Sequence, residues 1–201
     1  MSVSIEYSTK EINEIVFQNV LKMLVRRKVL DDYEEIYKKH LEDFVSKSVV
    51  NFTLKDKTYS VNLYGGKISS ISQNSQLDEY LRNNNNHHKI LILKELSKKV
   101  ANQILEYNNA EFFFEHEMME DIPSKNFIPE HILLTPDNKK VLLETFKEIE
   151  LAKITDKDMM SRYFRAVPGD IFKIVRPSNS AGKNIFYRRV VYSSINQIFN
   201  T

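Results

Sequence analysis

Near the start of the chain, apolar residues recur every three or four positions. They are Ile12, Ile15, Val16, Val20, Met23 and Leu24, and they follow Ser8 and Glu11, which have the spacing of a capping box. This pattern predicts a helix that ends near residues 26–28, where Arg and Lys suit the C-terminal end of the helix dipole. A second helix is predicted over residues 32–47, with one face formed by Ile36, His40, Leu41 and Phe44.

From residue 50 onward the apolar positions alternate, as they do in strands. Residues 50–54 and 59–63 predict two strands joined at Asp56 and Lys57, and Gly65 with Gly66 predicts another turn. The Asn-rich stretch 83–86, followed by His87 and His88, predicts a loop in which both imidazoles are solvated.

Three further elements complete the first part of the chain. The apolar run 90–93 predicts a buried strand. Ser97 predicts the cap of a helix that carries Val100, Ile104 and Leu105. Residues 111–117, which contain three consecutive Phe, predict another strand of a mixed sheet.

The remainder of the chain alternates short helices with strand patterns. Thr135 and Pro136 predict the start of a helix, and its apolar face consists of Val141, Leu142, Phe146 and Ile149. A short helix is predicted from about Asp156, with Met159, Met160, Tyr163 and Phe164. The whole predicts two domains: an α/β domain with a mixed sheet over residues 1–128 and a smaller α+β domain, with helices and a β-hairpin, over 129–201.

That hairpin covers residues 172–191 and turns through 177–182. Phe172, Ile174, Phe186 and Val190 are predicted on one face, and Ile171, Val175, Tyr187 and Val191 on the other. A two-stranded ribbon is marginal alone and must bury a face. We expect one face to pack on the helix from Pro136 to Lys147, and the other, rimmed by Lys173, Arg176, Arg188 and Arg189, to meet another protein.

The composition excludes several classes of protein and of functional site but does not indicate a function. The chain has 201 residues, 42% of them hydrophobic, a formal net charge of +2 and no cysteine. A real core is therefore expected, whereas disulfides, thiolate zinc sites and a Cys nucleophile are excluded. No stretch approaches the roughly 20 apolar residues of a membrane span, so we expect a soluble intracellular protein.

The candidate catalytic motifs in this sequence each lack residues or a context that their chemistry requires. Gly182–Lys183 lacks two parts of a phosphate loop: Pro177 stands where the first Gly is needed, and Asn184 stands where Ser or Thr must follow the Lys. Asp137 suits the first turn of a helix better than a nuclease site. Glu111, Glu115, His116, Glu117, Glu120 and Asp121 form an acidic cluster that suits a surface edge better than a hard-metal site. No Ser–His–Asp context is recognisable. We therefore expect no catalytic residue, no metal site and no cofactor.

A basic cluster surrounds the helix capped by Ser97. It consists of Lys94, Lys98 and Lys99. A helix N-terminus with flanking lysines can contact phosphates of a nucleic-acid backbone, and such contacts are blind to sequence and sensitive to salt. The alternative is an ordinary solvated face, which is what charge runs usually are.

The C-terminal part carries a specific resemblance. Its pieces are Pro129 with His131, the segment 162–164 (RYF) and residues 168–191 (PGDIFKIVRPSNSAGKNIFYRRVV). In order and spacing they resemble the fifth, shared subunit of eukaryotic RNA polymerases, a family that also has archaeal members. The N-terminal part matches less, at residues 41–44 and 94–103.

The resemblance implies a structural, non-catalytic subunit of a DNA-directed RNA polymerase. Residues 1–128 would form a jaw with a nuclease-like fold beside downstream duplex DNA, with Lys94, Ser97, Lys98 and Lys99 nearest to it. Residues 129–201 would form an assembly domain docked on the largest subunit. Its interface residues would be Arg162, Tyr163, Lys173, Arg176, Tyr187, Arg188 and Arg189. Magnesium and nucleotide would belong to the large subunits.

Two departures bear on this resemblance. Asp156, Lys157 and Asp158 stand where the family has Asp-Pro, and the family's Thr-Pro-Ser-Ala tip is not kept around Ser97. With the Asn-rich insertion, this drift is typical of a polymerase encoded by a large DNA virus, which would place the protein in a viral factory or virion rather than a nucleus. The alternative functions are a free-standing DNA-binding regulator and a divergent metal-dependent nuclease.

Overall fold

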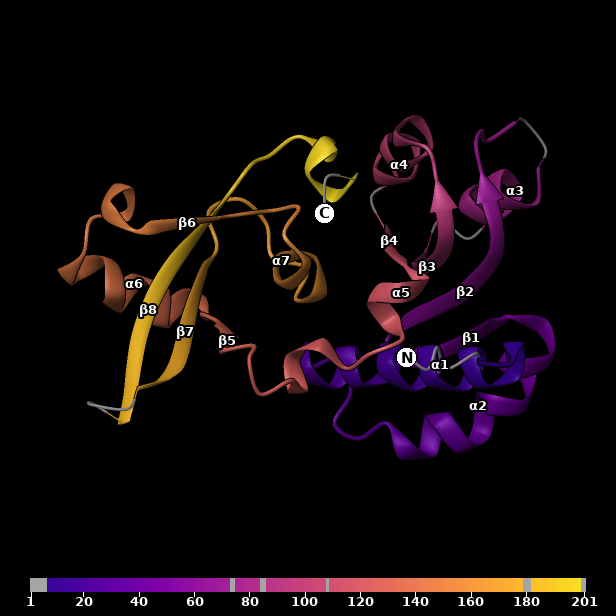
Figure 1. Ribbon diagram of the computed structural model, residues 1–201, viewed down its shortest axis with the longest axis horizontal. Coiled ribbons are helices and arrows are strands. Elements are labelled where there is room, and N and C mark those ends of the chain that lie inside the picture. The colour runs from indigo at the N-terminus through magenta and orange to yellow at the C-terminus, as the bar shows by residue number, and fades with distance from the viewer. Residues whose placement is uncertain (1–6, 73–74, 84–85, 108, 179–181, 200–201) are drawn as a thin grey trace, which may run out of the picture. The chain divides into compact units, whose positions relative to one another are not determined.

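The computed structural model describes residues 7–72, 75–83, 86–107, 109–178 and 182–199 (Figure 1). These residues form two compact units, of which the first ends at Asp121 and the second begins at Ile122. Mixed α/β structure, with helices and two mixed sheets, is confirmed. The boundary expected between 128 and 129, and the division of roles that goes with it, stay predictions.

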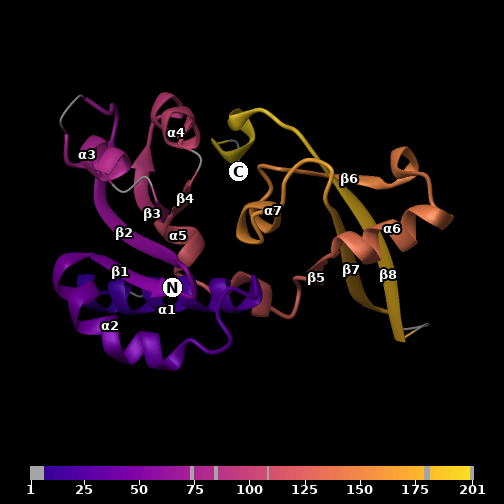
Figure 2. The same cartoon turned by 180° about the vertical axis from the view of Figure 1, so that it is seen from behind.

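The first unit contains a four-stranded sheet and five helices among the described residues. The strands are β1 (Val49–Leu54), β2 (Lys57–Ile68), β3 (His87–Leu96) and β4 (Ala110–Phe114). The helices are α1 (Thr9–Arg26), α2 (Glu34–Lys47), α3 (Gln76–Asn83), α4 (Lys98–Leu105) and α5 (Glu115–Met118). Helices α1 and α2 pack on one another, and both views show them side by side (Figures 1 and 2).

Helix α1 begins and ends where the sequence predicts. Ser8 Oγ accepts a hydrogen bond from the Glu11 amide, and the Ser8 amide donates to Glu11 Oε2 at 2.8 Å, which completes the capping box. Most of its apolar face is fully buried, at Val16, Phe17, Val20, Leu21, Met23 and Leu24, whereas Ile12 and Ile15 are half-buried. Burying such side chains stabilises a fold by roughly 1.5–3 kcal/mol each, so α1 is a main part of the core of this unit.

The sheet has the order β1-β2-β3-β4, antiparallel between β1 and β2 and parallel elsewhere. Strand β3 lies between two parallel neighbours, and residues 90–93 are 0% exposed. A strand covered on both faces needs an uninterrupted apolar run, which is why this one shows no alternation.

Several predictions in this unit were wrong. Gly65 and Gly66 were predicted to form a turn but lie within β2. The register of β2 with β3 shifts between Tyr64 and Lys67, so the two glycines occupy an irregularity at which the strand continues. The strand expected over 111–117 stops at Phe114 and continues as α5. Helix α3 precedes the Asn-rich stretch, and β3 starts at His87, so the expected loop is confined to a few residues, of which 84–85 lie outside the described ones.

The second unit contains another four-stranded sheet, of order β5-β7-β8-β6. Its strands are β5 (Glu130–Leu133), β6 (Ala152–Thr155), β7 (Ile171–Ser178) and β8 (Gly182–Val191). Its helices are α6 (Pro136–Thr145) and α7 (Met159–Tyr163), with short 3-10 turns η1 (Ile122–Ser124), η2 (Glu148–Glu150) and η3 (Ile195–Phe199). Strands β5 and β6 were missed, because four residues give too little alternation to detect.

Helix α6 starts as predicted but does not bury its apolar face. Thr135 Oγ1 accepts from the Asn138 amide, and Pro136 occupies the first helical position. Val141, Phe146 and Ile149 are nevertheless 63%, 46% and 77% exposed. The expectation that these residues form an internal packing face was therefore wrong.

The core of the second unit lies at the start of β7 and the end of β8. It consists of Ile154, Ala166, Phe172, Ile174 and Val190, with Leu133 and Phe164 packed against it. Phe172 is its centre, because the ring meets His131 and Phe164, each with ring centroids 5.8 Å apart. These contacts hold one end of the β7–β8 ribbon.

Candidate protein and nucleic-acid interfaces

Strands β7 and β8 form a long antiparallel ribbon whose register fixes which side chains share a face. Phe172 lies opposite Arg188, Ile174 opposite Phe186, and Lys173 opposite Tyr187. Because successive side chains alternate between faces, even-numbered residues share one face and odd-numbered residues the other. The face assignment made from sequence is therefore confirmed. The turn at its tip, residues 179–181, lies outside the described residues.

The even face changes character along its length. At the base, Phe172, Ile174 and Val190 are at most 2% exposed and belong to the core. Toward the tip, Phe186 is 47% exposed, and the Arg176 guanidinium lies over its ring, 5.5 Å from the centroid. Only the outer half of this face is therefore open to another protein.

The odd face turns toward α6. The ring of Tyr187 lies 6.3 Å from that of Phe146, centroid to centroid. A hollow of about 430 Å³ separates the ribbon from the helix, lined by Ile132, Leu134, Asn138, Val141, Leu142, Thr145, Lys173 and Tyr187. The prediction that one face packs on this helix holds only for the ring contact between Tyr187 and Phe146, because the hollow separates the rest of the helix from the ribbon.

The basic rim is split between the two faces. Lys173 and Arg189 lie on the α6 side, and Arg176 and Arg188 lie on the opposite side, so the rim predicted around a single face was wrong. The reason is that side chains alternate between the two faces along a strand, so odd-numbered Lys173 and Arg189 cannot share a face with even-numbered Arg176 and Arg188. Arg189 is held by Glu148, with 3.7 Å between Nη1 and Oε1.

The ribbon carries an uncompensated positive charge. Residues 171–191 contain five Lys or Arg and no Asp or Glu. Within the part of the chain that the structure describes, Lys173, Arg176, Lys183 and Arg188 make no ion pair. The pKa of His131 is lowered, chiefly by burial. The charges of Arg188 and Arg176 lower it further, whereas the hydrogen bond to the Pro129 carbonyl and the charge of Asp158 raise it.

The remaining predicted interface residues, Arg162 and Tyr163, lie on α7. Tyr163 is 3% exposed, and its ring meets Phe164 edge-on, so its side chain belongs to the core of the unit. Arg162 is half-buried and reaches Met159 Sδ at 3.5 Å. The Tyr163 side chain is therefore not accessible to a partner, whereas Arg162 is accessible in part.

In the first unit, the structure brings the predicted DNA-proximal residues together where β3 ends and α4 begins. Ser97 Oγ accepts from the Val100 amide at 3.3 Å and donates to the Ser69 carbonyl at 3.0 Å. Lys94, Lys98 and Lys99 are exposed around this cap. The geometry suits sequence-blind contact with phosphates, and the role in DNA binding stays a prediction.

The acidic cluster expected at the surface is partly internal. Glu111 Oε1 and Oε2 accept from the two terminal nitrogens of Arg27 at 2.6 and 2.8 Å, and Oε1 lies 2.7 Å from His88 Nε2. The side chains of Arg27, His88 and Glu111 are 6%, 9% and 12% exposed. The expectation of a solvated His88 and an exposed Glu111 was wrong, because their partner Arg27 is 84 residues away from Glu111 in sequence.

This ion pair controls the ionisation of Glu111. Burial alone would raise the pKa of the carboxyl group, but the Arg27 charge and the hydrogen bonds from His88 and Arg27 outweigh it. They hold the pKa well below its ordinary value of 4.5. The group is thus a structural anion, and its two oxygens are occupied by protein donors.

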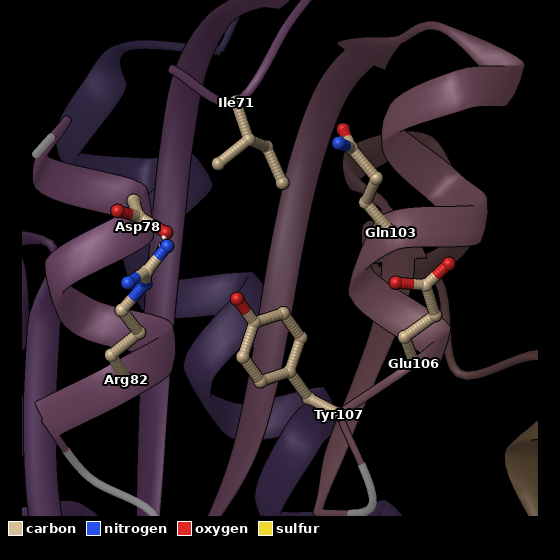
Figure 3. A pocket seen from close by; sticks show the side chains of 6 residues that line it. All are labelled: Ile71, Asp78, Arg82, Gln103, Glu106 and Tyr107. Carbon is tan, nitrogen blue, oxygen red and sulfur yellow. Dashed lines mark hydrogen bonds and ion pairs between the residues drawn. The ribbon is translucent and has the colours of Figure 1, made fainter. Parts of the chain in front are cut away.

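A second hollow, of about 480 Å³, lies between α3 and α4 (Figure 3). It is lined by Ile71, Asp78, Arg82, Gln103, Glu106 and Tyr107. Arg82 Nε donates to Asp78 Oδ1 at 2.8 Å. Among the described residues that line this hollow, no Ser or Cys nucleophile lies next to a base, and Asp78, one of the two carboxylates, is bound to Arg82.

Nowhere in the described residues do three His, Asp or Glu side chains converge as ligands for a metal ion. None of the helices in this part of the chain combines the length and apolar content that a membrane span requires.

Comparisons with known proteins point in one direction. Residues 120–190 match the family model described as RNA polymerase Rpb5, C-terminal domain. Subunit 5 of the DNA-directed RNA polymerase of Acanthamoeba polyphaga mimivirus is 34% identical over 135 residues, which are 66% of this chain and 65% of the viral one. A subunit named rpabc1 of RNA polymerases I, II and III from Dictyostelium discoideum is 30% identical over 90% of this chain and 100% of its own length. Subunit Rpo5 of Methanococcus maripaludis is 33% identical over 37% of this chain and 97% of its own.

Proposed function

This chain belongs to the RNA polymerase subunit 5 family, and on that premise we propose that it is a structural, non-catalytic subunit of a multisubunit DNA-directed RNA polymerase. It works inside the cell or viral factory in which that polymerase assembles. A tagged chain recovered with the large polymerase subunits supports this function. Recovery without them, or Mg²⁺- or Mn²⁺-dependent DNA cleavage that one carboxylate substitution abolishes, would refute it.

We propose that the second unit docks on the largest polymerase subunit through the outer half of the β7–β8 ribbon. The single observation that carries this is the combination there of exposed apolar side chains and cations that make no ion pair with any described residue. Ile185 and Phe186 are 51% and 47% exposed, next to Arg176, Lys183 and Arg188. An apolar centre rimmed by Arg is the usual anatomy of a protein interface.

Replacing Arg188 with glutamate is expected to weaken incorporation into the polymerase by about tenfold or more, since it reverses one of the charges that we propose to meet the partner. The isolated chain should keep its unfolding temperature, because Arg188 makes no ion pair within the described residues. The ratio of large subunits to tagged chain after affinity purification measures the effect. Lys140→Glu, the same charge change on α6, is the control. Equal incorporation of the two variants would remove Arg188 from the interface.

We further propose that the first unit lies as a jaw beside downstream duplex DNA, with Lys94, Lys98 and Lys99 closest to the phosphates. The support is their exposure around the start of α4, whose N-terminal amides favour anions. Binding of this kind is weak and insensitive to sequence, and the polymerase as a whole would supply the affinity.

The double variant Lys98→Glu with Lys99→Glu is expected to reduce retention of downstream DNA mainly at low salt. Each phosphate contact contributes about 0.9 to the slope of log Kobs against log salt, so the slope should fall by up to about 2. DNA retention by the purified polymerase, measured over a series of salt concentrations, tests this. Lys38→Glu with Lys39→Glu on α2 is the matched control. A slope unchanged from that control would contradict the assignment.

A further inference from the structure

The sheet of the second unit leaves the outer part of β8 unpaired on one side among the described residues. Strand β6 pairs with β8 only over Arg188–Val191, and β5 pairs with β7 only over Phe172–Val175. Both long strands therefore run on beyond their outer neighbours, which is visible as the projecting end of the ribbon (Figures 1 and 2). Over Gly182–Phe186, β8 is exposed and no strand in the described part of the chain pairs with its outer side.

The hydrogen-bond pattern shows which backbone groups point outward there. The Val190 amide donates to the Asp170 carbonyl, and the Val190 carbonyl accepts from the Gly169 amide, so residue 190 faces β7. The Val191 carbonyl accepts from the Asp156 amide, so residue 191 faces outward. In a regular antiparallel pair this alternates, and the register of β7 with β8 has no shift. Lys183 and Ile185 thus direct both their amide and carbonyl groups to the open edge.

The matching edge of β7 is closed by its sequence. Pro177 lies opposite Lys183 and, like it, occupies an outward-facing position beyond the end of β5. Proline has no amide hydrogen, and its presence on an edge strand prevents pairing with another strand. The opposite edge has no such block within the described residues. Its protection is electrostatic, since the lysines and arginines of the ribbon repel cationic segments and favour acidic ones.

We propose that the open edge of β8 at Lys183 and Ile185 pairs with an extended acidic segment of a large polymerase subunit, which becomes the fifth strand of this sheet. The inference rests on the proposed function and names how the docking occurs. Backbone hydrogen bonds hold the added strand. Ile185 and Phe186 supply apolar contacts on its two faces, and Lys173, Lys183, Arg176 and Arg188 select acidic side chains. A second copy of this chain is disfavoured, because two identical cationic ribbons repel one another.

Ile185→Pro tests the edge directly, with Ile185→Thr as the matched control. Both remove the isoleucine, but only proline removes the outward amide, and Pro177 shows that an outward position of this ribbon accepts proline. Each full-length tagged chain is expressed with its polymerase and recovered. We expect Ile185→Pro to lower the ratio of large subunits to chain by about tenfold relative to Ile185→Thr, with circular dichroism confirming that both isolated chains fold.

Amide exchange gives a second measurement that needs no variant. In the free chain, the amides of Lys183 and Ile185 should exchange rapidly, whereas in the recovered polymerase they should be protected by about 100-fold or more. Incorporation of Ile185→Pro at the level of Ile185→Thr, or amides that stay fast in the polymerase, would overturn the proposal while leaving the subunit function intact. Recovery of wild-type chain without large subunits would overturn both. A free chain that dimerises in sedimentation, and loses this with Ile185→Pro, would make a second copy the occupant and refute an acidic one.

Discussion

Replacing Glu111 with glutamine is expected to lower the free energy of unfolding of the chain by about 3–5 kcal/mol, which is the usual cost of removing one member of a buried ion pair. The substitution keeps the shape of the side chain but removes the negative charge that faces the Arg27 guanidinium, which is 6% exposed. Urea unfolding at pH 7, followed by far-ultraviolet circular dichroism, measures the difference. Glu42→Gln, an exposed carboxylate on α2, should change it by less than about 0.5 kcal/mol.

The same variant makes the pH dependence predictable. The folded pKa of Glu111 lies below its ordinary value of 4.5, so the carboxylate contributes stability that is complete above that pH and is lost as the pH falls below it. Wild type should therefore lose more stability than Glu111→Gln between about pH 5 and pH 3. Parallel acid curves for the two proteins would mean that the ion pair does not hold Glu111 ionised.

This ion pair also marks the limit of what the sequence could predict. Ser8, Ser97 and Thr135 were correctly identified as caps, because a cap depends on an amide only a few residues away. Glu111 and His88 were placed in solvent, because their partner is contributed by the end of α1. A charged residue that is buried by a distant partner has the same local pattern as one that is solvated, and only the tertiary structure separates them.

The candidate interface shows the same division. The resemblance identified the ribbon and its cations, and the alternation assigned its faces correctly. The sequence could not show that Phe172 and Ile174 are covered by the core of their own unit whereas Phe186 on the same face is not. Nor could it show the open edge, because β5 and β6 are short strands whose length decides how much of the ribbon remains unpaired.

Two phenylalanines on one face of the ribbon should separate folding from assembly. Phe172→Ala is expected to destabilise the isolated chain by about 3–5 kcal/mol, since it removes a ring that is 0% exposed at the centre of the core. Phe186→Ala removes the same atoms from a site that is 47% exposed. It loses chiefly the contact with Arg176 and should cost about 1 kcal/mol or less.

Phe186→Ala, which has the smaller effect on stability, is expected to have the larger direct effect on assembly into the polymerase. An exposed aromatic at the centre of an interface typically contributes about 2 kcal/mol or more to binding, which corresponds to about 30-fold in affinity. Phe186→Ala should therefore fold like wild type but be recovered with far less of the large polymerase subunits. Urea unfolding and affinity recovery, applied to both variants, test the pair. If Phe186→Ala assembled normally, the outer half of the ribbon would not be the docking surface, because no other large ring on that face is exposed among the described residues.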